Sequence, residues 1–140
     1  MDSIRLHYVV PGDDFTMAGA ASSDVKKTLK ELGISPAVIR NVSIAMYEGE
    51  INMVIHADGG NIDVEITERE IIMILADQGP GIENIDLAMK EGFSTAPDKI
   101  RSLGFGAGMG LPNIKKYTDE FSIETELGVG TTLNLKVYIQ

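Results

Sequence analysis

The sequence predicts an α+β sandwich, in which three helices cover one face of a mixed, mostly antiparallel sheet. Two observations support this fold class. Segments with apolar residues at every second position alternate with segments of helical period, in the order strand, helix, helix, strand, strand, helix, strand, strand. Where two strands follow one another directly in this order, a short turn joins them, which is typical of antiparallel hairpins. We expect residues 1–140 to form a single domain.

The first half of the chain is expected to contain one strand and two helices. Ile4–Val10 is β-branched and aromatic and ends at a Pro-Gly turn, as a strand does. Phe15–Leu32 has the helical period. Ser35 and Pro36 match an N-cap followed by proline, and they open a second helix that runs to about Ala57. The apolar positions expected to face the core are Met17, Ala21, Val25, Leu29 and Leu32 on the first helix and Val38, Val42, Ala45, Gly49 and Met53 on the second.

The second half is expected to contain two hairpins and a third helix. The expected elements are a turn at Asp58–Asn61, strands at Ile62–Thr67, Ile71–Ala76, Phe121–Glu126 and Thr132–Ile139, and a helix at Leu111–Tyr117. A long connection, with a helix-like piece at Ile82–Gly92, separates the hairpins. Connections of this length in small domains are usually functional, so we expect a hinged lid at about residues 82–108.

Composition and charge exclude several classes of function. A net charge of −9 argues against a nucleic-acid partner, because binding nucleic acid needs clustered Lys and Arg. The chain has no cysteine, which excludes disulfides, thiolate zinc sites and cysteine nucleophiles. No apolar run approaches the ~20 residues of a membrane span, so we expect a cytoplasmic protein without a membrane partner.

Two glycine clusters mark the ends of the long connection. They are DQGPG at Asp77–Gly81 and GFGAGMG at Gly104–Gly110. Glycine lets a ligand approach the backbone closely, and exposed N–H groups in such turns hold anions, most favourably where a helix begins. Two flexible loops are the alternative interpretation.

The second predicted helix carries a polar stripe. Glu48, Asn52 and His56 follow one another at intervals of four residues and therefore share one helical face. A solvated face is the ordinary explanation of such a pattern. Here apolar residues surround the stripe, and a carboxylate and an amide held among them need a partner or a ligand. Gly49 in mid-helix costs about 1 kcal/mol relative to Ala, which indicates close packing or a nearby ligand.

The well-known phosphate-binding motifs are absent. No glycine begins a GxxxxGK[ST] P-loop, and neither Gly104 nor Gly106 starts a GxGxxG fingerprint. The predicted element order also lacks the parallel βαβ units of dinucleotide-binding folds. The HRD and DFG motifs of protein kinases do not occur.

The chain instead resembles the GHKL ATPase superfamily, which has the Bergerat fold with an ATP lid. It is most similar to the bacterial anti-sigma-factor and stress-switch serine kinases. The matching motifs are EGEINMVIHA with Glu48, Asn52 and His56, DQGPGI with Asp77, Gly79 and Gly81, GFGAGMGL with Gly106, Gly108, Gly110 and Leu111, and GVGTT with Gly128, Gly130 and Thr131. Each motif alone is unspecific, whereas four in this order and on matching elements are specific. An additional Gly104 and Pro112 depart from the pattern of many relatives.

The resemblance implies a role for each matched residue. Glu48 would be the general base and Asn52 would ligate Mg²⁺, with His56 completing the motif. Asp77 would accept a hydrogen bond from the adenine amino group of ATP or ADP, Thr131 would assist through water, and Gly79 and Gly81 would let the base approach the backbone. The residues implied in cradling the phosphates are Gly104, Gly106, Ala107, Gly108, Met109, Gly110 and Leu111. Lys99 and Arg101 either reach a γ-phosphate or lie on the lid surface.

The resemblance also implies a reaction and partners. A chain of this size would act in trans, as an ATP-dependent protein-serine kinase that phosphorylates a STAS-domain anti-anti-sigma-like protein and binds a sigma factor or another regulator. By analogy alone, two copies would pair through the N-terminal strand. The alternatives are a nucleotide-gated binding module without useful phosphotransfer and an interaction domain with decayed motifs; the intact matched positions argue against the latter.

Overall fold

The described strands form one antiparallel sheet in the order β1-β2-β3-β5-β4. The computed structural model describes residues 3–12, 18–56, 59–79, 81, 89 and 110–139. Within these ranges the elements are β1 Ile4–Pro11, α1 Ala20–Glu31, α2 Pro36–His56, β2 Gly59–Ile66, β3 Glu70–Asp77, α5 Gly110–Lys116, β4 Glu120–Glu126 and β5 Gly130–Tyr138. Their order is the predicted one, and β3 is the central strand.

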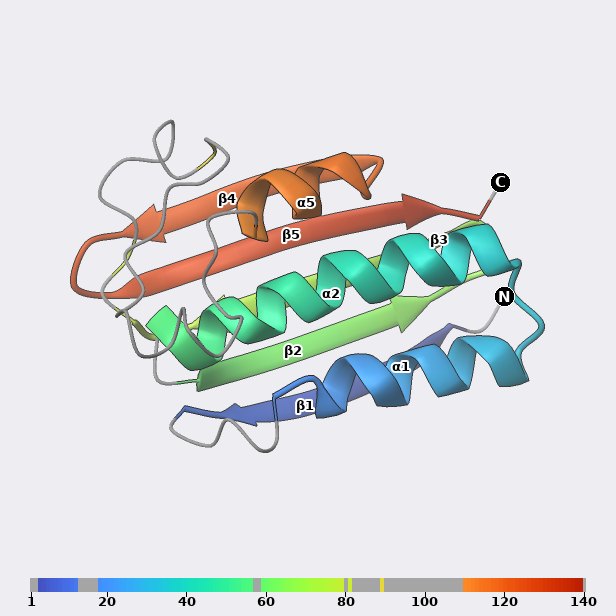
Figure 1. Cartoon of the computed structure of the whole chain (residues 1–140), viewed down its shortest axis with the longest axis horizontal. Helices are drawn as coiled ribbons and strands as arrows, with labels where there is room; N and C mark the ends of the chain where they lie inside the picture. Colours follow the sequence, from blue (N-terminus) through green and yellow to red (C-terminus); the bar gives the residue numbers. More distant parts are fainter. Residues whose placement is uncertain are drawn as a thin grey trace.

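The three described helices lie on one face of the sheet (Figure 1). The long helix α2 runs along the middle of this face, between α1 on the side of β1 and α5 on the side of β4 and β5 (Figure 1). This arrangement confirms the predicted α+β sandwich. It also brings α2 into contact with both other helices, so that α2 is the element from which side chains can reach either neighbour.

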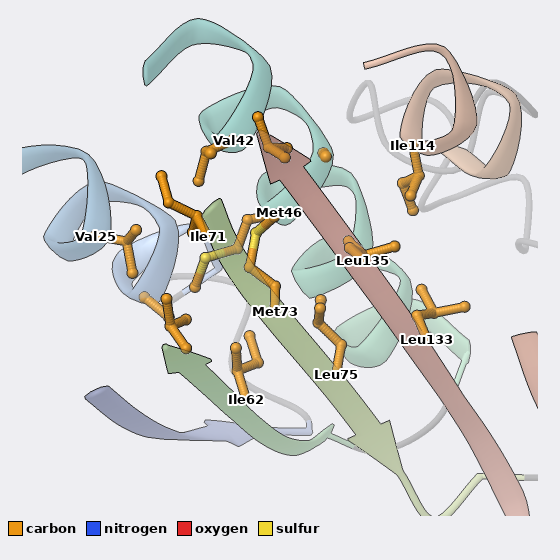
Figure 2. Packing of buried hydrophobic residues seen from close by; sticks show 14 of the residues in the cluster. Val25, Val42, Met46, Ile62, Ile71, Met73, Leu75, Ile114, Leu133 and Leu135 are labelled. Carbon is orange, nitrogen blue, oxygen red and sulfur yellow. The ribbon is translucent and has the colours of Figure 1, made fainter. Parts of the chain in front are cut away.

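The core fills the layer between the helices and the sheet. Alternate residues of the inner strands point into it, including Ile71, Met73 and Leu75 of β3 (Figure 2). Gly49 of α2 lies directly over β3, because a Cβ at this position would be 2.4 Å from Cδ2 of Leu75. The expected close packing at Gly49 is therefore confirmed. The expected core positions Val38, Val42, Ala45 and Met53 of α2 are also buried.

Two predicted boundaries are wrong, and glycine explains both. The first helix begins at Ala20 rather than Phe15, because Gly19 has a φ of 92° and ends the helical geometry there. Gly59 and Gly60 were expected in a turn, but they pair with Pro11 and Asp77 as the first residues of β2. A Cβ on Gly59 would lie 2.1 Å from the Val10 carbonyl oxygen, so only glycine allows this pairing.

Two smaller expectations of the sequence concern single elements. Leu32 was expected to face the core, but it follows the last turn of α1 and is 43% exposed. Met17 and the helix-like piece at residues 82–92, apart from Met89, lie outside the described residues. No helix in the described ranges is long and apolar enough to span a membrane.

Candidate functional site

Asp77 is the last residue of β3, and its carboxylate is fixed by the backbone around it. The Oδ1 atom accepts hydrogen bonds from the backbone N–H of Gly79, at 2.9 Å, and of Thr131, at 3.0 Å. Gly130 approaches the same residue from β5, because a Cβ there would lie 2.1 Å from the Asp77 carbonyl oxygen. The half-buried carboxylate is thus held at the end of the central strand by groups that come from both sides.

The other predicted residues of this end of the sheet lie around Asp77. Gly81 has a φ of 83°, and a Cβ on it would be 2.7 Å from the Glu126 carbonyl oxygen, so the glycine seats this turn against the end of β4. Thr131 is 7% exposed, and its Oγ1 shares a hydrogen bond of 2.9 Å with Oγ1 of Thr125 on β4. Side chains larger than hydrogen at Gly81 and Gly130 would fill the space that these contacts occupy.

Asn52 of α2 faces the beginning of α5. A Cβ built on Gly110 would lie 3.0 Å from Nδ2 and 3.1 Å from Oδ1 of Asn52. The carboxamide is half-buried, so it is accessible beside the first turn of α5. The side chain of Leu111 next to it is 9% exposed and belongs to the core, which fixes this end of α5 against the sheet.

Glu48 lies one helical turn before Asn52 and also faces α5. Burial raises the pKa of the Glu48 carboxyl above its ordinary value, and a hydrogen bond to the Asn113 side chain of α5 partly opposes this increase. The carboxylate is half-buried. Glu48 and Asn52 therefore share the helix face that the sequence predicted, and α5 is the element that this face contacts.

A groove of about 540 Å³ runs between α1 and α2, and Glu48 lies at one side of it. Its α1 wall consists mainly of small residues, and its α2 wall carries larger ones. The lining residues are Ala18, Gly19, Ala20, Ser22, Ser23 and Lys26 on one wall and Ser43, Ile44, Tyr47 and Glu48 on the other. Glu48 thus lies between this groove and the Asn113 side chain of α5.

Several predicted site residues lie outside the described part of the chain. These are the side chain of His56, most of the expected lid at residues 82–108 with Lys99 and Arg101, and the phosphate-cradle residues Gly104, Gly106, Ala107, Gly108 and Met109. Of the expected cradle, Gly110 and Leu111 are described, and they begin α5 beside Asn52.

Sequence reasoning missed two residues that hold the site in place. Asn113 is the partner of Glu48, and no local pattern marked it. Glu50 is 1% exposed and accepts hydrogen bonds from the start of α1. No local pattern marked Glu50 either, because its donors lie 28 to 31 residues earlier in the chain.

The described residues fit a magnesium nucleotide. Mg²⁺ in such sites is held by one or two protein oxygens together with phosphates and waters, and a single carboxamide such as that of Asn52 suffices. Among the described residues no cluster of three or more His, Cys, Asp or Glu could hold an ion by itself. A dedicated metal cage is therefore not found in this part of the chain, while the Asn52 position matches a metal shared with a phosphate.

Comparison with known protein families identifies the class of this chain. The model of the "Histidine kinase-, DNA gyrase B-, and HSP90-like ATPase" family matches residues 28–140. This range contains the whole of α2, the sheet from β2 onward and α5. The chain belongs to this family of nucleotide-binding ATPase domains.

Individual relatives indicate where in the family the chain lies. It is 33% identical over 112 residues to the serine/threonine-protein kinase RsbT of Bacillus subtilis (strain 168), a match that covers 77% of this chain and 78% of RsbT. It is 30% identical over 144 residues to the anti-sigma F factor of Clostridium kluyveri, covering 96% of this chain and 93% of that protein.

Solved structures establish the same fold. A structure of the RsbU and RsbW domains of a Mycobacterium tuberculosis protein aligns with a TM-score of 0.60 and 18% identity, over 96% of this chain and 32% of that longer one. A crystal structure of the SiaB-SiaC complex from Pseudomonas aeruginosa aligns with a TM-score of 0.56 and 11% identity, over 95% of this chain and 89% of the matched one.

Proposed function

We propose that this chain is an ATP- and Mg²⁺-dependent protein-serine kinase that acts as an anti-sigma regulatory factor or switch kinase. Its substrate is a STAS-type antagonist protein, which it phosphorylates in trans. The names of two relatives, a serine/threonine-protein kinase and an anti-sigma factor, support this class of activity. The observation that carries the proposal is the Glu48 carboxylate, which is half-buried, has a raised pKa and lies one turn from Asn52 and beside an open groove.

The adenine end of the nucleotide is assigned to the end of β3. Asp77 accepts a hydrogen bond from the adenine amino group. The hydrogen bonds from the backbone N–H groups of Gly79 and Thr131 hold the Asp77 carboxylate in the required orientation. Gly81 and Gly130 let the backbone pack closely against Glu126 and Asp77, and Gly79 and Gly81 let the base approach the backbone. Thr131 assists from its buried position on β5.

The phosphate end is assigned to the space between α2 and α5. Asn52 would hold Mg²⁺ through its side-chain oxygen, and the ion would supply neutralisation of the phosphate charge. Gly110 leaves room for the Asn52 carboxamide at the beginning of α5. Glu48 then lies one turn along α2 from the metal ligand, on the same face.

Glu48 acts as the general base. It takes the proton of the acceptor serine hydroxyl as the serine oxygen forms its bond to the γ-phosphorus; the bond from that phosphorus to the β–γ bridging oxygen breaks, and ADP leaves with the electron pair. A carboxylate with a raised pKa holds the transferred proton better than an exposed one. The hydrogen bond to Asn113 orients the carboxylate on the α5 side.

The groove between α1 and α2 gives the acceptor protein access to Glu48. Its small-residue wall accommodates a segment of main chain, and Glu48 at its side meets the serine hydroxyl. Lys26 in the lining favours an acidic residue next to the acceptor serine. The same protein is proposed to bind a sigma factor or another regulator in the cytoplasm, and to pair with a second copy through β1, which lies at the edge of the described sheet.

The test is transfer of labelled phosphate from ATP to STAS-domain proteins of the source genome, each incubated with the purified chain and Mg²⁺. We expect one of them to be labelled on serine. Glu48→Ala should abolish this labelling while the affinity for ADP, measured by calorimetry, stays within about twofold. Absence of labelling by the wild-type chain, with nucleotide binding intact, would contradict the kinase proposal.

A nucleotide-gated binding module is the second candidate, favoured by a relative that is named an anti-sigma F factor rather than a kinase. In this candidate the chain exchanges partners according to the bound nucleotide, and Glu48 has no chemical role. Partner exchange that survives Glu48→Ala unchanged, measured by co-elution with and without ATP, would favour this candidate over the kinase.

A further inference from the structure

Glu50 connects α2 to the beginning of α1 through a buried carboxylate. Its Oε2 accepts from the backbone N–H of Gly19, at 3.0 Å, and of Ala21, at 3.2 Å. Its Oε1 accepts from the backbone N–H of Ser22, at 2.9 Å, and from the Ser22 hydroxyl, at 2.7 Å. The residue is 1% exposed, so these four bonds replace the water that the carboxylate loses.

The first turn of α1 depends on this distant carboxylate. Gly19 at the N-cap position makes no side-chain hydrogen bond to the helix, and the first turn contains no acidic residue. A Ser or Asp at the N-cap would satisfy these N–H groups locally. The chain satisfies them instead with an acceptor on a different helix, and the bonds therefore fix the position of α1 relative to α2 in addition to capping it.

The fixed turn is one wall of the groove that leads to Glu48. Gly19 and Ser22 both line the groove and both donate to Glu50. Gly19 also packs against the ring of Tyr47, because a Cβ on it would be 2.9 Å from Tyr47 Cε1. Tyr47 precedes Glu48 in the sequence. The hydrogen bonds from the start of α1 to Glu50 therefore set the distance between the α1 wall and Glu48, the residue assigned as base.

We propose that Glu50 is a positioning residue for the protein substrate: by clamping the start of α1, it sets the width of the groove that presents the acceptor segment to Glu48. This inference rests on the proposed kinase function. Glu50 lies two residues from Glu48 and from Asn52, about 200° around the helix from each, so it faces away from the nucleotide. Its removal should therefore affect use of the acceptor protein and leave nucleotide binding unchanged.

The experiment compares Glu50→Gln and Ser22→Ala with Val137→Ala in the full chain. Gln keeps the size of Glu but turns an N–H₂ group toward backbone donors, and Ala at 22 removes the hydroxyl donor alone. Val137 is 1% exposed and lies on β5, so its truncation is the control for lost stability without a change in the groove. The readouts are KM and kcat for the STAS protein that the wild type phosphorylates, and the affinity for ADP.

We expect Glu50→Gln to raise the KM for the acceptor about tenfold or more and Ser22→Ala to raise it a few-fold, with the ADP affinity of both within about twofold of wild type. Val137→Ala should change none of these values. If Glu50→Gln does not fold, as judged by circular dichroism, Ser22→Ala decides the result. Two results would overturn the positioning role. One is a KM of Glu50→Gln for the acceptor equal to that of Val137→Ala. The other is a loss of ADP affinity in Glu50→Gln as large as its increase in KM. Failure of the wild type to phosphorylate any STAS protein would overturn the kinase proposal itself and this inference with it.

Discussion

The carboxamide of Asn52 lies against the first residue of α5, Gly110, so closely that a Cβ on Gly110 would be 3.0 Å from its Nδ2 and 3.1 Å from its Oδ1. This contact joins the helix that carries the polar stripe to the helix that follows the second glycine cluster. It explains why glycine at this position matters in a region where the chain is already helical.

Gly110→Ala should weaken binding of the magnesium nucleotide about tenfold without unfolding the protein. The added Cβ would lie 3.0 Å from Nδ2 and 3.1 Å from Oδ1 of Asn52, so the carboxamide must shift by a few tenths of an ångström from the position assigned to a metal ligand. Alanine is otherwise favourable in a helix, and the fold should be retained. Calorimetry with ADP and Mg²⁺ measures the effect. Lys115→Ala, on the exposed side of α5, is the control; equal affinities of the two variants would contradict the Asn52 assignment.

Gly130→Ala should reduce the free energy of unfolding by at least about 3 kcal/mol. A φ of 153° is unfavourable for alanine, and the Cβ would lie 2.1 Å from the Asp77 carbonyl oxygen, so the backbone of β5 must shift. Gly128→Ala is the matched control in the same turn, since its φ is 79° but nothing lies within 4 Å of the added carbon. We expect the control to lose only about 1 kcal/mol. Urea denaturation of both variants separates the cost of the contact with the Asp77 carbonyl from the cost of a positive φ.

Asp77→Asn should lower the affinity for ADP about tenfold or more while changing stability little. The remaining Oδ1 can still accept from Gly79 and Thr131, but the Nδ2 group that replaces the second oxygen cannot accept from adenine. Asp63→Asn, at an exposed aspartate on β2, is the control. Unchanged nucleotide affinity of Asp77→Asn would show that adenine binds elsewhere.

Glu48→Gln should stabilise the protein at neutral pH by roughly 0.5 kcal/mol, a small gain because the side chain is only half-buried. Burial raises the pKa of the folded carboxyl, so its protonation favours folding below the pKa of the unfolded state. That contribution is lost as the pH rises through the folded pKa. At pH 7 the ionised carboxylate therefore opposes folding, and Gln removes the penalty. Thermal unfolding at pH 7 and below pH 4 tests this, since the stability advantage of Glu48→Gln should disappear in acid. The control is Glu124→Gln, at an exposed position of β4.

Asn113→Ala should shift the acid limb of the pH-rate profile to higher pH. The hydrogen bond from Asn113 lowers the pKa of Glu48 against the effect of burial, so its removal lets that pKa rise further. A general base must be ionised, and kcat then falls at a higher pH than in the wild type. The control is Asn134→Ala, because Asn134 alternates on β5 with the buried Leu133 and Leu135 and so lies on the face of the sheet opposite the helices. Identical acid limbs for Asn113→Ala and wild type would mean that Glu48 does not limit the rate as a base.

Periodicity was sufficient to predict most of the fold. The order of elements, the core stripe of α2 and the position of Asp77 at the end of the central strand all follow from local spacing, and the structure confirms them. The boundaries at Gly19 and Gly59 could not be predicted in the same way. A glycine can end a helix, form a turn or begin a strand, and in this chain the choice depends on contacts with Tyr47 and with the Val10 carbonyl, which are distant in sequence.

Dependence on contacts between residues distant in sequence also separates the predicted from the unpredicted residues of the site. Asp77 and Asn52 belong to motifs of adjacent residues, so their sequence neighbours identified them. Glu50 accepts from groups that lie 28 to 31 residues earlier in the chain, and only packing of α1 on α2 brings these groups together. Asn113 is likewise a partner of Glu48 only because α5 packs on α2. Sequence patterns predicted the residues assigned to the nucleotide, and the tertiary structure was needed for the residues that hold them.

The two walls of the groove differ in what a substitution there would disturb. The exposed residues Ser23 and Lys26 line the groove from α1, whereas Glu48 and Asn52 belong to α2 and Asp77 belongs to β3. Under the proposed kinase function, duplicated copies of such a gene would diverge at these few positions and acquire separate signalling circuits within one cell, while each keeps the residues proposed for catalysis. Insulation between parallel pathways would then require only a few changes on the surface of one helix.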